Sequence, residues 1–268
     1  MLIQSVVWGT CLVTPLLAAW GLQRQWLFPR PKNGEVLVAE HHQIDALMLP
    51  LGHRSLKGFM ARPRAASGRF QGVLYLNGRR ENPTSIFRAL HHMPNSHVLC
   101  FFYDRLGPAW FKPDEAQLVS DALAVLGWFA REHGAEPDQI HVVGRSLGSG
   151  LAVQVAAARP VAGLVLISPF DCLLSAVRVL LPYWPAWALK DAFDSVSYMP
   201  RLKCPGLMVM GDADKTVPLS LSRRLQAQLP EPWPELVLAG AGHRGLLKRA
   251  EVHQALGHFL AAHARAMA

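Results

Sequence analysis

From about residue 70 onward, short apolar runs alternate with longer stretches in which hydrophobic side chains recur every three or four positions. Short apolar runs are typical of buried strands, and the longer periodic stretches are typical of amphipathic helices. The runs that we interpret as strands cover residues 70–78, 97–104, 139–144, 161–169, 204–212 and 235–240. The stretches with helical spacing cover residues 83–93, 113–134, 147–159, 219–229 and 246–267.

This alternation is typical of βαβ units, in which helices connect parallel strands of one sheet. Because such crossovers are right-handed, the helices cover both faces of the sheet. Two earlier runs, residues 43–50 and 56–63, each end in a proline and predict an opening pair of strands. The sequence therefore predicts an α/β fold with a mainly parallel twisted sheet and helices on both faces.

Residues 171–200 interrupt the alternation, because they contain apolar helical pieces and a Pro-Tyr-Trp-Pro-Ala-Trp cluster but no strand pattern. The segment falls between two predicted strands, at the edge of the sheet where ligands bind in such folds. It is either an insertion that only covers the core or a short helical cap. We favour the cap, in which Tyr183, Trp184 and Trp187 would line an acyl pocket.

The N-terminus departs from the pattern of the body. Residues 1–23 contain no charged side chain, and about 20 residues of this kind can cross a bilayer as a helix. Basic residues follow in segment 24–34, whose prolines and glycine predict a linker. This order favours a retained single-pass membrane anchor, with the main domain, residues 35–268, in the cytoplasm. The alternatives are a cleaved signal of an exported enzyme and a soluble or peripheral segment.

Composition narrows the functional classes. The chain has 268 residues, 51% of them hydrophobic, which suits one large domain with a substantial core. The net charge is +8, but the basic residues are scattered singly or in pairs without a basic helix face. We therefore expect no nucleic-acid partner, whereas anionic lipid or acidic substrates fit the charge. The four cysteines show no metal-ligand spacing, which favours reduced and mostly buried thiols.

The segment G-R-S-L-G at residues 144–148 fits the pattern G-x-S-x-G. It follows one predicted strand and opens a predicted helix, which is the context that this motif requires. The sharp turn leaves no room for side chains at Gly144 and Gly148, and it exposes the hydroxyl of Ser146 at the carboxyl ends of the strands. The sequence therefore predicts Ser146 as a nucleophile. The alternative is an ordinary corner between a strand and a helix.

A serine nucleophile needs a base, and the base needs an orienting carboxylate. In this architecture the acid follows the serine along the chain, and the histidine comes last. Asp214 lies directly after a buried strand, and His243 lies in a glycine-rich loop after the last strand. Asp212, which we interpret as shaping the turn, and Asp171, after the preceding strand, are the rivals for the acid. The remaining histidines, including the pair His91–His92, are interpreted as solvated or core side chains.

Two backbone N–H groups are candidates for an oxyanion hole. That of Leu147 lies at the start of the helix after the serine, and that of Arg79 lies in the loop after residues 70–78. The alternative for the second group is a simple turn in which Arg79 and Arg80 are solvated.

The chain resembles the α/β-hydrolase superfamily, and more narrowly its membrane-associated serine-aminopeptidase and monoacylglycerol-lipase-like hydrolases. The resemblance covers about residues 35–262 and rests on LYLNGRREN, VVGRSLGSGLA, LISPFD, VMGDADKTVP and GAGHRGLL. It implies a triad of Ser146, His243 and Asp214 that acts without a metal or an organic cofactor. The chain departs from these relatives in one turn, where Asn77-Gly78 stands in place of His-Gly, which puts the shape of the oxyanion loop in question.

These observations predict a serine hydrolase that cleaves ester or thioester bonds, or amide bonds, of small acyl substrates or lipids through an acyl-enzyme. An acyltransferase of the same fold is the first alternative, in which a bound alcohol or amine replaces water. A non-catalytic protein of this fold that binds a lipid or a protein partner is the second.

Overall fold

The computed structural model describes Arg24 and residues 41–51, 54–65, 70–79, 81–105 and 114–264. The apolar segment 1–23 and all of the linker except Arg24 lie outside the described residues, so the predicted anchor is not tested by the fold. Among the residues that are described, no helix combines the length and the apolar character needed to cross a membrane.

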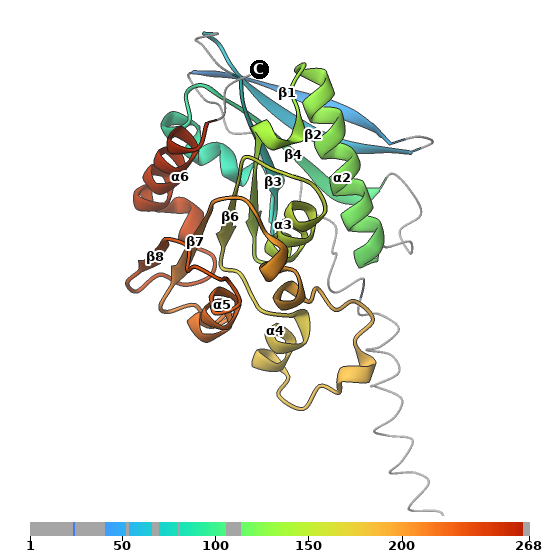
Figure 1. The fold of residues 1–268 in the computed structure, drawn as a ribbon, viewed down its shortest axis with the longest axis vertical. Coiled ribbons are helices and arrows are strands. Elements are labelled where there is room, and N and C mark those ends of the chain that lie inside the picture. Colours follow the sequence, from blue (N-terminus) through green and yellow to red (C-terminus); the bar gives the residue numbers. More distant parts are fainter. Residues whose placement is uncertain are drawn as a thin grey trace, which may run out of the picture.

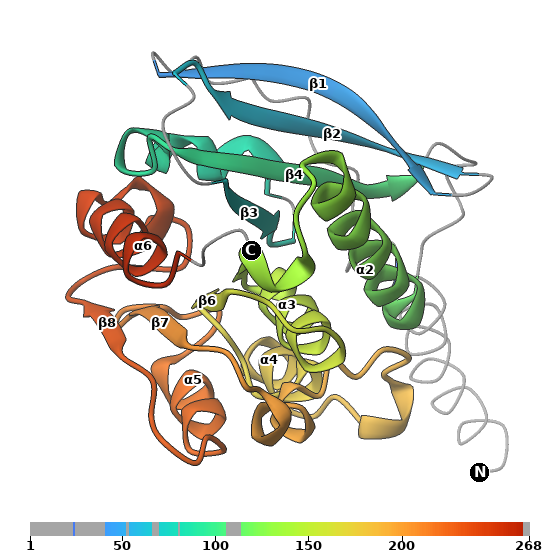
Figure 2. The same cartoon turned by 45° about the horizontal axis from the view of Figure 1, so that its top comes forward.

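One eight-stranded sheet forms the centre of the molecule, in the order β1-β2-β4-β3-β5-β6-β7-β8. The first two pairings, β1 with β2 and β2 with β4, are antiparallel, and all the others are parallel (Figures 1 and 2). The strands are β1 His42–Leu51, β2 Arg54–Pro63, β3 Gln71–Leu76, β4 Ser96–Arg105, β5 Ile140–Arg145, β6 Gly163–Ile167, β7 Gly206–Gly211 and β8 Glu235–Leu238. The predicted α/β class is therefore confirmed.

Helices cover both faces of the sheet, as the alternation of patterns predicts. The α-helices are α2 Glu115–Glu132, α3 Leu147–Ala158, α4 Leu173–Leu180, α5 Leu219–Gln226 and α6 Ala250–Ala262. The 3₁₀-helices are η1 Pro83–His92, η2 Pro137–Gln139, η3 Ala186–Ala188, η4 Ser195–Ser197, η5 Met199–Arg201 and η6 Leu246–Lys248.

Two hydrophobic clusters lie on opposite faces of the sheet, because successive side chains of a strand point to opposite faces. In β3, Leu74 and Leu76 pack toward α2 and α3, whereas Val73 and Tyr75 pack toward η1 and α6. The uninterrupted apolar runs read from the sequence are thus strands buried on both sides.

The segment expected to be helical at residues 83–93 forms a 3₁₀-helix, η1, rather than an α-helix. Its buried side chains fall at every third position, in the two rows Pro83–Ile86–Ala89 and Thr84–Phe87–Leu90. A period of three matches the three residues per turn of a 3₁₀-helix. The expected closing helix is also divided, because Arg249 is extended between η6 and α6.

The insertion 171–200 contains α4 and the helices η3, η4 and η5, and no strand, as predicted. Two of its aromatic side chains do not have the expected surroundings. Tyr183 is 97% exposed and Trp187 is 76% exposed, whereas Trp184 packs against the core. Because Pro182 and Pro185 end the helical path after α4, they turn this part of the chain outward. Tyr183 and Trp187 therefore face outward and do not line an enclosed acyl pocket.

Candidate active site

Ser146 lies on a strained turn between β5 and α3. Its φ of 50° and ψ of −120° are values that residues other than glycine rarely adopt. A Cβ at Gly148 would lie 2.0 Å from the carbonyl oxygen of Leu76, and one at Gly144 would lie 2.5 Å from the carbonyl oxygen of Gly148. Only glycine therefore permits the start of α3 to pack this closely against the end of β3, which is the arrangement expected from the motif.

A continuous chain of hydrogen bonds joins the three predicted side chains. The Oγ of Ser146 lies 3.1 Å from Nε2 of His243, and Nδ1 of His243 lies 2.7 Å from Oδ2 of Asp214. Each residue follows a strand, and because β5, β7 and β8 are parallel, their carboxyl ends lie along one edge of the sheet. The side chain of His243 is 17% exposed and that of Asp214 is 1% exposed. The series of hydrogen bonds is therefore open to solvent toward the serine and buried at the carboxylate.

The carboxylate of Asp214 accepts four hydrogen bonds. Oδ2 accepts from His243 Nδ1 and, at 3.0 Å, from Ser168 Oγ, and Oδ1 accepts from the backbone N–H groups of Thr216 and Val217. Burial alone would raise the pKa of Asp214, but the hydrogen bonds from His243 and from the backbone outweigh it, so the pKa lies below its usual value. Asp214 is therefore held as an anion beside the imidazole.

Neither rival carboxylate takes this position. The carboxylate of Asp171 bonds Arg224 Nε at 2.7 Å and also accepts from Cys172 N and Ser175 Oγ. Oδ1 of Asp212 accepts from the backbone N–H of Gly240 at 2.7 Å, which is the turn-shaping role expected for it. Of the three candidates, Asp214 is the carboxylate that contacts His243.

The two candidate oxyanion donors come from segments that meet beside Ser146. Leu147 is the first residue of α3, so its N–H has no acceptor within the helix. A Cβ at Gly78, the residue before Arg79, would lie 3.3 Å from Cβ of Ser146. The loop after β3, which carries Asn77-Gly78, thus lies against the serine turn. The N–H of Gly78 itself is occupied, because it donates to Oε2 of Glu81 at 2.7 Å.

A buried ion pair, which the sequence analysis did not identify, links the loops around Ser146. Nη1 of Arg145 lies 2.7 Å from Oε1 of Glu81, and both side chains are about nine-tenths buried. Nη2 of Arg145 donates to the carbonyl oxygen of His243 at 2.6 Å. Glu81 also accepts from the hydroxyl of Tyr75 and from the N–H of Gly78. One carboxylate and one guanidinium therefore join the loop after β3, the serine turn and the histidine loop.

The surroundings of Arg145 shift its pKa. Burial by itself would lower this pKa, but the neighbouring groups, first of all Glu81, together outweigh burial, and the pKa lies above its usual value. Burial and the Glu81 charge raise the pKa of Tyr75 as well. The signals in the sequence were Arg145 at the variable position before the serine and Glu81 after the two arginines of NGRREN. Both residues look solvent-exposed until the fold brings them together.

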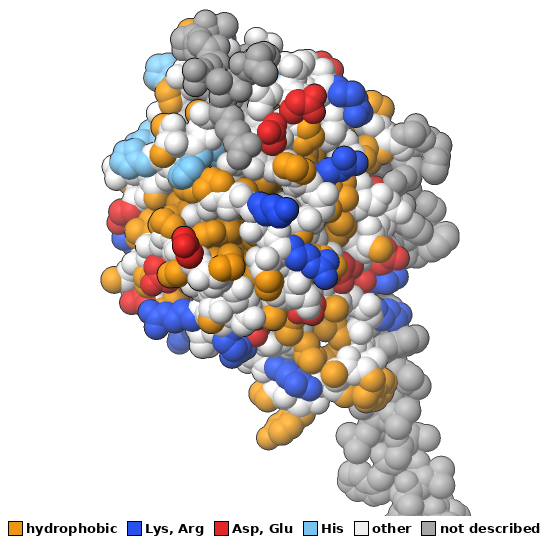
Figure 3. Space-filling view, viewed as in Figure 1, with side chains coloured by type: hydrophobic (Ala, Val, Ile, Leu, Met, Phe, Trp, Pro, Cys, Tyr) orange, Lys and Arg blue, Asp and Glu red, His pale blue; other side chains and the backbone are white. Residues whose placement is uncertain are grey.

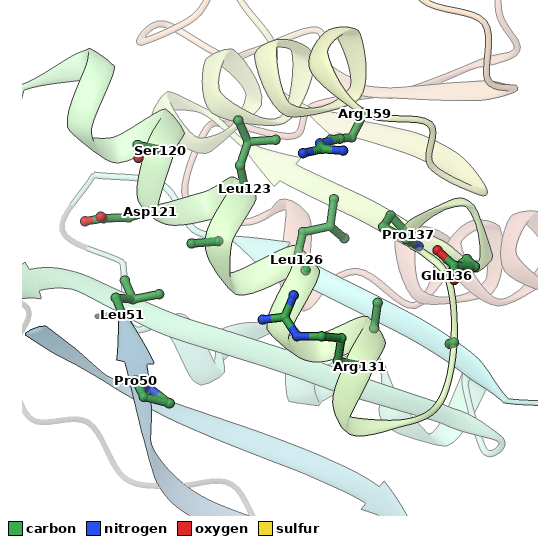
Figure 4. A pocket seen from close by; sticks show the side chains of 14 residues that line it. Pro50, Leu51, Ser120, Asp121, Leu123, Leu126, Arg131, Glu136, Pro137 and Arg159 are labelled. Atoms are coloured by element: carbon green, nitrogen blue, oxygen red, sulfur yellow. The ribbon is translucent and has the colours of Figure 1, made fainter. Parts of the chain in front are cut away.

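A surface groove elsewhere on the molecule is distinct from this arrangement. It has a volume of about 670 Å³ and lies between α2 and the end of β1, with Leu51, Leu126 and Arg159 in its lining (Figure 4). None of Ser146, Asp214 and His243 lines it. The hydrogen-bonded chain at the strand ends, rather than this groove, is therefore the candidate active site.

The buried ion pair leads to a stability prediction. Arg145→Met should lower the free energy of unfolding by about 3–5 kcal/mol, because it leaves the Glu81 carboxylate buried without its partner. Urea denaturation measures this change. The double variant Arg145→Met, Glu81→Leu should lose less than the sum of the two single changes, since the pair is removed as a unit.

Arg249→Met is the matched control, because it removes an ion pair to Glu251 in which both side chains are exposed. Solvent screens such pairs, so little change in the unfolding free energy is expected. Equal losses for Arg145→Met and Arg249→Met, or full additivity in the double variant, would show that the buried pair does not hold these loops.

Comparison with known proteins finds relatives over most of the chain. No family model matches it. The uncharacterized protein Rv2307c of Mycobacterium tuberculosis is 32% identical over 237 residues, which cover 85% of this chain and 83% of the relative. The α/β hydrolase domain-containing protein aho-3 of Caenorhabditis elegans is 30% identical over 177 residues, or 66% of this chain. Those residues cover 52% of aho-3, so the match spans about half the length of that relative.

Solved structures share the fold at low sequence identity. An esterase of Pyrococcus furiosus superposes with a TM-score of 0.70 at 16% identity, over 88% of this chain and 99% of the esterase. A dienelactone hydrolase of Anabaena variabilis has a TM-score of 0.65 at 19% identity, over 84% of this chain and all of that one. Together with the eight-stranded sheet, these likenesses show that the chain has the α/β-hydrolase fold.

Proposed function

We propose that this protein is a serine hydrolase that cleaves ester or thioester bonds, or amide bonds, of acyl substrates. The observation that carries the proposal is the hydrogen-bonded chain from Ser146 through His243 to Asp214, with the serine on a strained turn that reaches solvent. A hydroxyl becomes a nucleophile when an adjacent base accepts its proton and a third group orients that base.

In the proposed first step, Oγ of Ser146 attacks the carbonyl carbon while Nε2 of His243 takes the hydroxyl proton. The carbonyl oxygen becomes an oxyanion that accepts hydrogen bonds from the N–H groups of Leu147 and Arg79. The tetrahedral intermediate then collapses: the bond to the leaving group breaks, and His243 returns the proton to the departing oxygen, sulfur or nitrogen. In the second half-reaction water attacks the acyl-enzyme in the same way and releases the free acid.

Asp214 has an orienting role in this scheme. Because its Oδ2 accepts from Nδ1 of His243, the other ring nitrogen keeps the lone pair that accepts the serine proton. The negative charge of Asp214 also stabilises the imidazolium that forms. Ser168 and the backbone N–H groups of Thr216 and Val217 hold the carboxylate in place, so we assign them to the support of the acid.

An acyltransferase would share the first half-reaction and differ in the second, where a bound alcohol or amine would take the place of water. The products separate the two activities, since hydrolysis releases a free acid and transfer leaves the acyl group on the acceptor. A protein of this fold that only binds a ligand would form no acyl-enzyme.

Exposed apolar side chains on the insertion support the proposal that the substrate is bound at a lipid surface. Among the described residues, five large hydrophobic side chains are exposed, and four of them belong to the insertion: Leu180, Leu181, Tyr183 and Trp187. In Figure 3, hydrophobic side chains gather at the lower end of the described part of the molecule, where Figure 1 shows α4 of the insertion. Exposed apolar groups gathered in this way are typical of interaction surfaces, and aromatic rings favour the interface of a membrane with water.

Arg24, the residue directly after the apolar segment 1–23, contacts the insertion. Its Nε and Nη2 donate to the two carboxylate oxygens of Asp191, at 3.0 and 3.1 Å, and Asp191 is buried within the insertion. The residue that follows segment 1–23 is therefore bound to the insertion that carries the exposed apolar side chains. We propose that segment 1–23 anchors the protein in a membrane, with the hydrolase domain on the cytoplasmic side, and that the insertion faces the lipid.

The first functional prediction concerns the nucleophile. Ser146→Ala should abolish labelling by a fluorophosphonate probe and lower kcat/KM for a short p-nitrophenyl ester by a factor of about 10⁴ or more, because the attacking hydroxyl is gone. Ser120→Ala, which changes an exposed serine of α2, should label at the wild-type rate. Labelling of Ser146→Ala would refute the assignment, and a wild-type protein without labelling would favour a binding function.

The second concerns the acid. Asp214→Asn should lower kcat by about 10⁴, because the amide favours the wrong tautomer of His243. Asp171→Asn is the matched control: it weakens the contact to Arg224 and should leave kcat nearly unchanged. Steady-state rates of the two variants, with circular dichroism to verify folding, make the comparison. A crippled Asp171→Asn with a mild Asp214→Asn would reverse the assignment.

The third concerns the lipid surface. The full-length protein should stay with membranes through high salt and alkaline carbonate, because an apolar span is not released by charge screening. The double variant Tyr183→Ser, Trp187→Ser should hydrolyse a long-chain ester in vesicles more slowly and a soluble acetate ester at the wild-type rate.

Met48→Ser is the control for this variant, since Met48 is exposed on β1 and lies outside the insertion. Met48→Ser should leave the rate of hydrolysis of both substrates unchanged. Recovery of the full-length protein in the carbonate supernatant would contradict the anchor. Equal effects of Met48→Ser and the double variant on the vesicle substrate would contradict the role of the insertion.

A further inference from the structure

Three histidine side chains meet on the face of the molecule that carries η1 and α6. His91 and His92 end η1, and His253 belongs to α6. One ring nitrogen from each lies within 4.8 Å of the corresponding nitrogen of the other two, and the ring centroids of His91 and His92 are 4.1 Å apart. Figure 3 shows histidine side chains gathered over this part of the surface.

Close packing between the two helices holds the cluster in position. A Cβ at Gly257 would lie 2.3 Å from the carbonyl oxygen of His92, so the end of η1 rests directly on the backbone of α6. His253 is buried, His92 is half-buried and His91 is exposed. The ring of His253 is thus fixed by its surroundings, whereas the less buried rings of His91 and His92 can adjust.

The hydrogen bond of His253 fixes which nitrogen is available as a ligand. Nε2 lies 2.9 Å from the carbonyl oxygen of Leu247, and because a carbonyl only accepts, Nε2 carries the proton and donates it. Nδ1 therefore keeps its lone pair. Metal-binding histidines commonly donate their second nitrogen to a backbone carbonyl in this way, which orients the ring.

We propose that His91, His92 and His253 form a binding site for one zinc ion, separate from the candidate active site. Neutral imidazole is a preferred ligand of Zn²⁺, with Zn–N distances of about 2.0–2.1 Å, which place two ligands of a tetrahedral site about 3.3 Å apart. The ring centroids of His92 and His253 are the farthest apart of the three pairs, at 6.2 Å, so changes of rotamer at both His91 and His92 would bring the three nitrogens to this spacing. Water fills the fourth position.

An ion at this site would join two helices that support the candidate active site. η1 follows the turn with Gly78 and Glu81, and α6 follows the loop with His243. The proposed hydrolysis has no step at this ion, so its role is structural. Because zinc would bind the folded chain in preference to the unfolded one, binding should raise Tm.

The test uses the full-length protein after removal of metals with a chelator. Titration with Zn²⁺ in competition with a chromophoric chelator should give one ion per chain and a rise in Tm. His253→Gln, whose amide can still donate to Leu247, should weaken binding at least about tenfold, and so should His91→Gln, an exposed change that leaves the core intact. His263→Gln is the matched control, because this histidine lies at the C-terminal end of α6, the helix that carries His253, but outside the cluster.

The expected result is lost affinity and lost thermal stabilisation in both cluster variants, with wild-type values in His263→Gln. The proposal is overturned if the wild-type protein binds zinc no better than the variant with all three histidines replaced. It is also overturned if His263→Gln weakens binding as much as His91→Gln does. Fluorophosphonate labelling of each variant is a separate readout, so failure of the zinc site is distinguishable from failure of the hydrolase assignment.

Discussion

The approach of α3 to the end of β3 is the constraint on which the candidate site depends. Gly148 lies so close to the carbonyl oxygen of Leu76 that no other residue fits there. This contact forces the chain to turn sharply at Ser146 and to adopt a positive φ. The strained backbone at Ser146 places its hydroxyl at the edge of the sheet, within reach of His243. Packing that admits only glycine thus creates the partly exposed position of the serine.

Electrostatics then connects this turn with its neighbours. Arg145, the residue before Ser146, extends into the interior and bonds both Glu81 and the backbone of His243. A charge is costly to bury alone, whereas a buried ion pair is tolerated and is very sensitive to the loss of either partner. Nη1 and Nη2 of Arg145 make these contacts, while its Nε has no hydrogen-bond partner among the described residues. The ion pair therefore specifies the relative positions of three loops that the sheet alone would only bring to the same edge. The buried carboxylate of Asp214 is stabilised in a similar way, because it accepts four hydrogen bonds.

The regions outside this site divide into two kinds of surface. The insertion after β6 presents apolar side chains to solvent while its inner face, with Phe193 and Met199, belongs to the core. The face with η1 and α6 presents imidazoles instead. The first surface has the chemistry of a lipid contact and the second that of a metal ligand set, so the two proposals depend on different parts of one scaffold and can fail independently.

The sequence by itself determined the α/β class, the two-sided covering of the sheet and the positions of Ser146, Asp214 and His243. These features follow from patterns that are local in the chain: hydrophobic periodicity, glycines at a sharp turn, and polar residues directly after buried strands. The side-chain patterns did not reveal the pairing of Arg145 with Glu81, the support of Asp214 by Ser168 or the meeting of His91 and His92 with His253. Only the tertiary structure decided these contacts, because each joins segments that are distant in the chain. The tertiary structure also decided that Tyr183 and Trp187 face outward. The sequence does not show whether an aromatic side chain faces a pocket or solvent, because that depends on where the folded chain turns.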